Sequence, residues 1–94
     1  MQKIILAALL TPLIALPVAA DSFGKPCTTV PSNAWLSMEA IEKIVTDHGF
    51  TITKSRLKGT CAEVYVKDGQ GLKAELFIDP ATGNPVGTDW TRVR

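Results

Sequence analysis

Two alternating segments near the middle of the chain constrain its fold more than any other feature. Residues 61–67 and 73–79 each place an apolar side chain at every second position. A period of two is typical of strands that bury one face, and the short linker between the segments suits a hairpin. Residues 79–83, Asp-Pro-Ala-Thr-Gly, then offer the residue types that form turns. The sequence therefore predicts a β-hairpin followed by a turn.

The apolar positions also constrain how the two strands pair. They form two rows: Ala62, Val64 and Val66 in the first segment, and Ala74, Leu76 and Ile78 in the second. Residues opposite each other in an antiparallel pair point to the same side of the sheet, so Val64 must face Ala74 or Leu76. The first register would place two glutamates opposite each other. We therefore favour the second register, in which Tyr65 faces Glu75.

The linker between the segments carries its own hairpin signal. A tight turn at Asp68 and Gly69 is favoured locally, because Asp-Gly suits a two-residue turn. Such a turn would shift the register by one residue and direct a charged row toward the core. We therefore predict a longer loop, in which Gly71 adopts a positive φ.

One helix and two further strands complete the predicted fold. Ser37 is a good N-cap and Gly49 is a residue type that ends helices, so we expect a helix over 38–48. Its apolar stripe recurs at three- and four-residue spacing: Ala40, Ile41, Ile44, Val45 and His48. Residues 50–57 are rich in β-formers, and residues 86–94 can form an edge strand. The sequence predicts an α+β fold with one helix packed on a three- to four-stranded antiparallel sheet.

The first 20 residues have the pattern of a cleavable signal peptide. Lys3 precedes an apolar run, and small residues occupy positions 18–20. Prolines interrupt the run, which is shorter than the roughly 20 residues needed to span a bilayer, so a membrane anchor is disfavoured. We predict cleavage after Ala20. This would leave residues 21–94 as one exported domain, periplasmic or secreted, with no stable membrane insertion.

The chain contains two cysteines, and two cysteines in an exported domain normally pair. A bridge between Cys27 and Cys61 would tie an irregular N-terminal arm, residues 21–34, to the hairpin. In the chain-entropy model it would stabilise the fold by about 3–4 kcal/mol. A redox or metal-binding pair is the alternative, but it lacks a Cys-x-x-Cys spacing and a neighbouring histidine. We therefore predict a structural disulfide.

Charge and residue inventory argue against several functions. Nine basic and nine acidic residues remain once Lys3 is removed with the signal, so no basic excess indicates a nucleic acid or an anionic membrane as partner. His48 is the only histidine and has no second ligand at helical spacing, so we predict no metal site and no cofactor. No Gly-x-Ser-x-Gly motif marks a nucleophile, and we predict no enzymatic activity.

The order of these elements resembles the PepSY family in its short, single-domain exported form. The matching positions are Cys27, Trp35, Gly49-Phe50, residues 61–65, the glycine-containing hairpin and the turn at 79–83. Ala62 departs from the family, which usually has an aromatic residue there, and Gln70-Gly71 replaces a typically charged hairpin. The resemblance implies one helix on an antiparallel sheet and a binding or inhibitory role, since PepSY modules occur in the propeptides of secreted metallopeptidases.

The sheet face opposite the helix is the predicted site of partner binding. Five candidate residues lie on this face: Tyr65, Phe77, Lys73, Glu75 and Lys54. Trp90, in the C-terminal tail, is a sixth candidate for partner contact, which either packs in the core or lines a partner groove. Aromatic side chains within a charged rim are typical of modest protein interfaces. In the alternative interpretation, the arm that Cys27 holds covers Tyr65 and Phe77. We interpret Glu63 and Glu75 as part of a solvated strand face.

These observations predict a non-enzymatic module that binds an envelope or secreted protein. Regulation or inhibition of a peptidase is one candidate role, and the sequence does not name the partner. The alternative is an envelope sensor that binds a small ligand or a metal ion.

Overall fold

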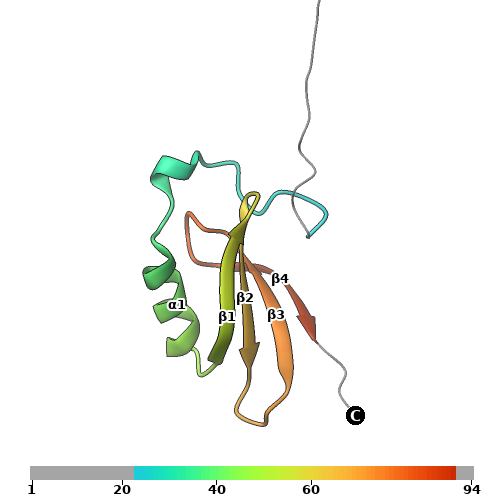
Figure 1. The fold of residues 1–94 in the computed structure, drawn as a ribbon. Coiled ribbons are helices and arrows are strands. Elements are labelled where there is room, and N and C mark those ends of the chain that lie inside the picture. Colours follow the sequence, from blue (N-terminus) through green and yellow to red (C-terminus); the bar gives the residue numbers. More distant parts are fainter. Residues whose placement is uncertain (1–22, 91–94) are drawn as a thin grey trace, which may run out of the picture.

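The computed structural model describes residues 23–90, in which four strands form an antiparallel sheet and one helix lies on one side of it (Figure 1). The elements are α1 (Met38–Asp47), β1 (Thr51–Lys58), β2 (Cys61–Lys67), β3 (Lys73–Ile78) and β4 (Pro85–Trp90). The strands lie side by side in chain order, and each is antiparallel to the next. The predicted α+β architecture is confirmed, with four strands in the sheet.

The favoured hairpin register is the one observed. Val64 pairs with Leu76 and Tyr65 pairs with Glu75 across β2 and β3. The loop spans 68–72, where the Asp68 N–H donates to the Leu72 carbonyl over 2.9 Å and Gly71 has φ 86°. The longer loop keeps the apolar rows on one side of the sheet, because a slip of one residue would exchange the two faces.

The strand ends differ slightly from those predicted. β1 runs one residue past the predicted 50–57, because the two-residue turn falls at Gly59 and Thr60 and pairs Lys58 with Cys61. β4 begins at Pro85, and residues 91–94 of the predicted edge strand lie outside the described residues. The predicted signal peptide, residues 1–20, also lies outside them.

The helix begins where its N-cap predicts. The Ser37 side chain accepts a hydrogen bond from the Ala40 N–H over 3.1 Å, and Gly49 has φ 94° just beyond the other end. His48 leaves helical geometry and caps the helix, so the predicted span of 38–48 is one residue too long. The buried stripe is also narrower than predicted, since Ile41 and Val45 are buried while His48 is exposed.

We call the side of the sheet that carries α1 the helix face. The core lies there, between the helix and the two predicted apolar rows. Its buried members are Ile41, Val45, Ala62, Val64, Val66, Ala74, Leu76 and Ile78. Alternation along β2 and β3 thus directs one complete row of side chains into a single core.

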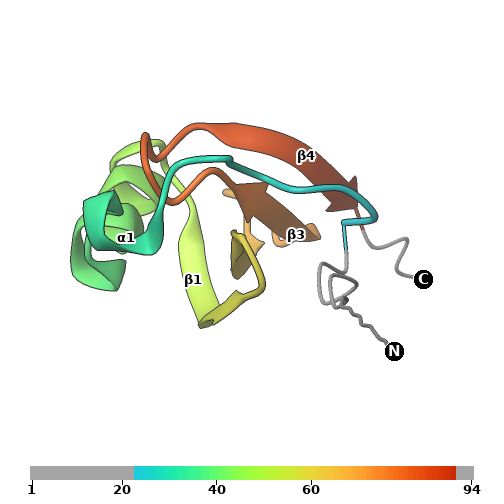
Figure 2. The same cartoon turned by 90° about the horizontal axis from the view of Figure 1, so that it is seen from above.

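We call the opposite side, which presents Glu63, Tyr65, Glu75 and Phe77, the arm face. Residues 23–31 run across the strands there toward the start of the helix (Figure 2). Cys27 and Cys61 form the predicted disulfide, and the Cys27 N–H donates to the Thr60 hydroxyl over 2.9 Å. The predicted pairing of the cysteines therefore holds one irregular segment against the sheet.

Candidate functional site

A single helix cannot cover a four-stranded sheet. Strands lie about 4.8 Å apart, whereas a helix with its side chains is about 10–12 Å wide. In this fold α1 packs mainly over β1 and β2. The helix face over β3 and β4 is therefore left partly uncovered.

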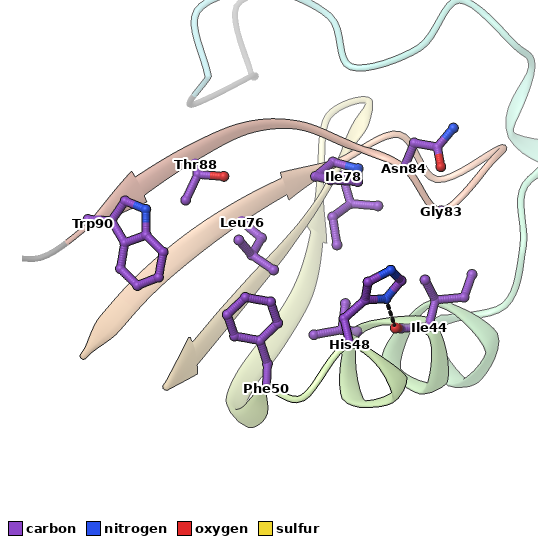
Figure 3. A pocket seen from close by; sticks show the side chains of 11 residues that line it. Ile44, His48, Phe50, Leu76, Ile78, Gly83, Asn84, Thr88 and Trp90 are labelled. Carbon is purple, nitrogen blue, oxygen red and sulfur yellow. Dashed lines mark hydrogen bonds between the residues drawn. The ribbon is translucent and has the colours of Figure 1, made fainter. Parts of the chain in front are cut away.

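This uncovered region forms an apolar groove with a volume of about 230 Å³ (Figure 3). Ile44 and Phe50 line its helix side, Leu76 and Ile78 form its floor, and Thr88 and Trp90 line it from β4. None of the described residues that line the groove is acidic, and none is a lysine or an arginine. The groove can therefore accept uncharged side chains without burying an unpaired charge.

The turn after β3 closes one end of the groove. Gly83 has φ 82°, and a Cβ atom at this position would lie 2.5 Å from Ile44 Cδ1. Only glycine combines this backbone conformation with such a close approach to the helix. The Asp79 carboxylate supports the turn by accepting the Ala81 N–H over 2.8 Å. The Asp-Pro-Ala-Thr-Gly sequence thus positions a wall of the groove.

β4 borders the groove and is an edge strand in the described part of the chain. It pairs with β3 on one side, and its other side carries no described strand. Val86 and Trp90 on this strand are 43% and 48% exposed. A free strand edge offers backbone N–H and C=O groups to another extended chain.

The six predicted partner-surface residues do not form one surface. Trp90 pairs with Ala74 and lies on the helix face, where it lines the groove. The other five, Lys54, Tyr65, Lys73, Glu75 and Phe77, lie on strands β1 to β3 at arm-face positions. The β3–β4 register shifts between Phe77 and Ile78, which puts Trp90 on the face opposite to that of the other five.

The arm covers Phe77 but not Tyr65. The Phe23 ring stacks on Phe77 with 5.0 Å between ring centroids, and Phe77 is only 7% exposed. The disulfide completes this small cluster. Tyr65 remains partly exposed, with Lys54 Nζ 5.6 Å from the centre of its ring. The alternative interpretation therefore holds for Phe77, and the two aromatics do not form an open pair.

Glu63 was predicted to lie on a solvated strand face, but it is fully buried. Its Oε1 accepts a hydrogen bond from Arg56 Nε over 3.0 Å. The same oxygen lies 2.9 Å from Arg56 Nη2, with which it forms an ion pair. The position of the turn between β1 and β2 was the sequence signal that could have predicted this pair. The turn at Gly59 and Thr60 places Arg56 directly opposite Glu63.

Three side chains on the arm face have raised pKa values. Burial and then the neighbouring Glu63 raise the pKa of Glu75, although a hydrogen bond with Tyr65 acts in the opposite direction. Burial is also the main cause that raises the pKa of Tyr65, followed by the charge of Glu75. The hydrogen bond to Glu63 raises the pKa of Arg56. The strands therefore concentrate titratable groups on this face.

Residues 23–90 hold neither a metal-binding cluster nor a helix that could cross a membrane. No group of three or more His, Cys, Asp or Glu side chains there is arranged to hold a metal ion. His48 Nδ1 lies 2.7 Å from the Ile44 carbonyl, one helical turn earlier. In the same part of the chain, no helix is long and apolar enough to cross a membrane.

The fold and groove define a small α+β domain with one face only partly covered by its helix. Residues 4–89 match the family described as the peptidase propeptide and YPEB domain, and this chain belongs to that PepSY family. The match begins within the predicted signal peptide and ends in β4. Comparisons with curated proteins and with solved structures find no match.

Proposed function

We propose that this chain is an exported, non-catalytic module that binds an extended segment of a partner protein beside β4. The observation that carries the proposal is a groove without acidic, lysine or arginine side chains, next to a strand edge that pairs with no strand among residues 23–90. An extended chain added to such an edge gains main-chain hydrogen bonds, and a pocket beside it selects the alternate side chains. Trp90 and Thr88 border both features, so we assign the partner contact to them.

Two parts of the proposal remain: the kind of partner, which family membership supports, and export, which the disulfide supports. A peptidase-propeptide domain acts by binding another protein, so we propose an envelope or secreted peptidase as the first partner to test. Disulfides persist in oxidising compartments, and this one agrees with export directed by residues 1–20. We propose cleavage after Ala20 and residues 21–94 as the exported domain.

Site-specific photocrosslinking in the native cell envelope tests the contact. A photoreactive residue at position 88 should crosslink to a protein, and the crosslink should map to an extended apolar segment of it. The same residue at position 54 on the arm face serves as the matched control. Trp90→Ala should lower the yield at position 88 by about tenfold or more, the size expected for an aromatic anchor.

The possible outcomes separate the candidate functions. Crosslinking from position 54 alone would move the partner site to the arm face and overturn the assignment to the groove. A small apolar molecule bound to the purified protein in native mass spectrometry, without a protein crosslink, would favour the alternative function as a ligand sensor. If the partner is a peptidase, the purified domain should inhibit it, and Trp90→Ala should weaken that inhibition.

A further inference from the structure

The arm face contains a buried carboxylate with one unused oxygen. Arg56 directs both of its contacts to Glu63 Oε1. Glu63 Oε2 is buried and has no hydrogen-bond partner among the described residues. A buried carboxylate oxygen without a donor is unfavourable, because it loses its hydrogen bonds to water and gains none in the protein. Glu63 Oε2 therefore needs a hydrogen-bond donor, and neighbouring acids that are all ionised cannot provide one.

Glu75 is the neighbouring group that can provide it. Glu63 pairs with Phe77 and Tyr65 pairs with Glu75, so the two glutamates are diagonal neighbours on the same face. Glu75 also stands directly opposite Asp89 of β4, which places a second acid beside it. Ionisation of all three acids would concentrate like charges on a partly buried surface, which is unfavourable.

We infer that Glu63 and Glu75 share one proton in the folded protein, with Glu75 carrying it and donating it to the unused Glu63 Oε2. This hydrogen bond joins β2 to β3 on the arm face and makes the face responsive to pH. When Glu75 loses the proton, the hydrogen bond is lost and two carboxylates repel each other. The inference rests on the fold alone and is independent of the proposed partner.

The other charged groups on this face do not remove the need for the proton. Arg56 of β1 is committed to Oε1, and Lys54 stands over the Tyr65 ring. Lys67 and Lys73 line the same outer hollow as Glu75, together with Tyr65 and Asp89. On the arm itself, Lys25 stands over the Phe23 ring. Burial, Glu63 and Asp89 favour the protonated form of Glu75, whereas the hydrogen bond with Tyr65 favours the ionised form; the net effect is a raised pKa.

The direction of the pH effect follows from this shift. The folded pKa of Glu75 lies above its ordinary value of 4.5, so the folded state binds the proton more tightly than the unfolded chain. The resulting stabilisation is complete below about pH 4.5 and is lost as the pH rises through the folded pKa. The Glu75→Gln variant should not lose this stabilisation as the pH rises, because the glutamine amide donates a hydrogen bond at every pH.

Two measurements test the shared proton. Carbon NMR of the Glu75 carboxyl in the wild-type protein should give a pKa above 4.5, and Glu63→Gln should lower it. In urea unfolding, Glu75→Gln should be more stable than the wild type at neutral pH, and the difference should shrink as the pH falls. Glu39→Gln, at an exposed position in the first turn of α1, is the control: it removes a carboxylate that favours the helix dipole, so it should not stabilise the protein at neutral pH.

Three results would overturn the inference. In the first, Glu75 of the wild-type protein titrates at or below 4.5. In the second, its raised pKa persists unchanged in Glu63→Gln, which would assign the shift to burial and Asp89 alone. In the third, the stability difference between the wild type and Glu75→Gln does not depend on pH. The NMR titration decides the matter even if a variant fails to fold.

Discussion

The two faces of the sheet are built differently, although the same strands supply both. On the helix face, a regular helix packs on two alternating apolar rows and leaves a groove over β3 and β4. On the arm face, an irregular segment held by a disulfide covers one aromatic residue, beside a buried glutamate paired with a partly exposed arginine. One face follows from periodicity, whereas the other depends on a covalent link and on individual charges.

This difference has a physical cause in the size of the domain. A small chain has too few residues to place a second layer of secondary structure on each face of its sheet. A covalent link can hold a short irregular segment where burial alone is insufficient. We therefore expect the helix face to carry most of the folding free energy and the arm face to respond to redox state and pH.

The largest expected effect comes from a charge in the centre of the helix face. Ile41→Asp should abolish cooperative unfolding, because Ile41 is fully buried and an unpaired carboxylate there is strongly destabilising. Ile44→Asp adds the same charge one turn away, beside the groove, where the position is only partly buried. For Ile44→Asp, thermal unfolding followed by circular dichroism should show a protein that still folds but has a lowered Tm. Equal losses in the two variants would mean that the core is centred elsewhere on α1.

Removal of the disulfide tests the arm face. The double change Cys27→Ser and Cys61→Ser should lower the free energy of unfolding by about 2–5 kcal/mol, measured by urea titration. Nuclear Overhauser contacts between Phe23 and Phe77 should weaken, while those between Ile41 and its neighbours in the core should remain. Retention of the Phe23 contacts would show that the arm stays in place without the covalent link.

A smaller effect is expected at Gly87, which lies directly under Phe23. A Cβ atom here would overlap the Phe23 ring, although the backbone conformation is open to other residues. Gly87→Ala should therefore displace the ring and lower the free energy of unfolding by roughly 1–2 kcal/mol. Gly69→Ala is the control, since no atom lies within 4 Å of its Cβ position, and its effect should stay within about 0.5 kcal/mol. If both substitutions are neutral, Phe23 contributes little to the arm face.

The sequence by itself determined the parts of the fold that rest on local or periodic information. Alternation in 61–67 and 73–79 left two β2–β3 registers, because a slip of one residue would have exposed the whole apolar row. Avoiding two opposed glutamates selected the observed one. Ser37 and Gly49 marked the helix ends through their capping chemistry. The disulfide followed from cysteine count, since the chain has only two cysteines.

Only the tertiary structure decided which face each side chain of the outer strands occupies. The β3–β4 register shift lies between Phe77 and Ile78, and it pairs Trp90 with Ala74 on the helix face. A strand without this shift would have placed Trp90 opposite Lys73 on the arm face. The position of the β1–β2 turn decided that Arg56, rather than another residue of β1, stands opposite the buried Glu63. A one-residue change exchanges the faces of a strand, and residues distant in the sequence determine where that change falls.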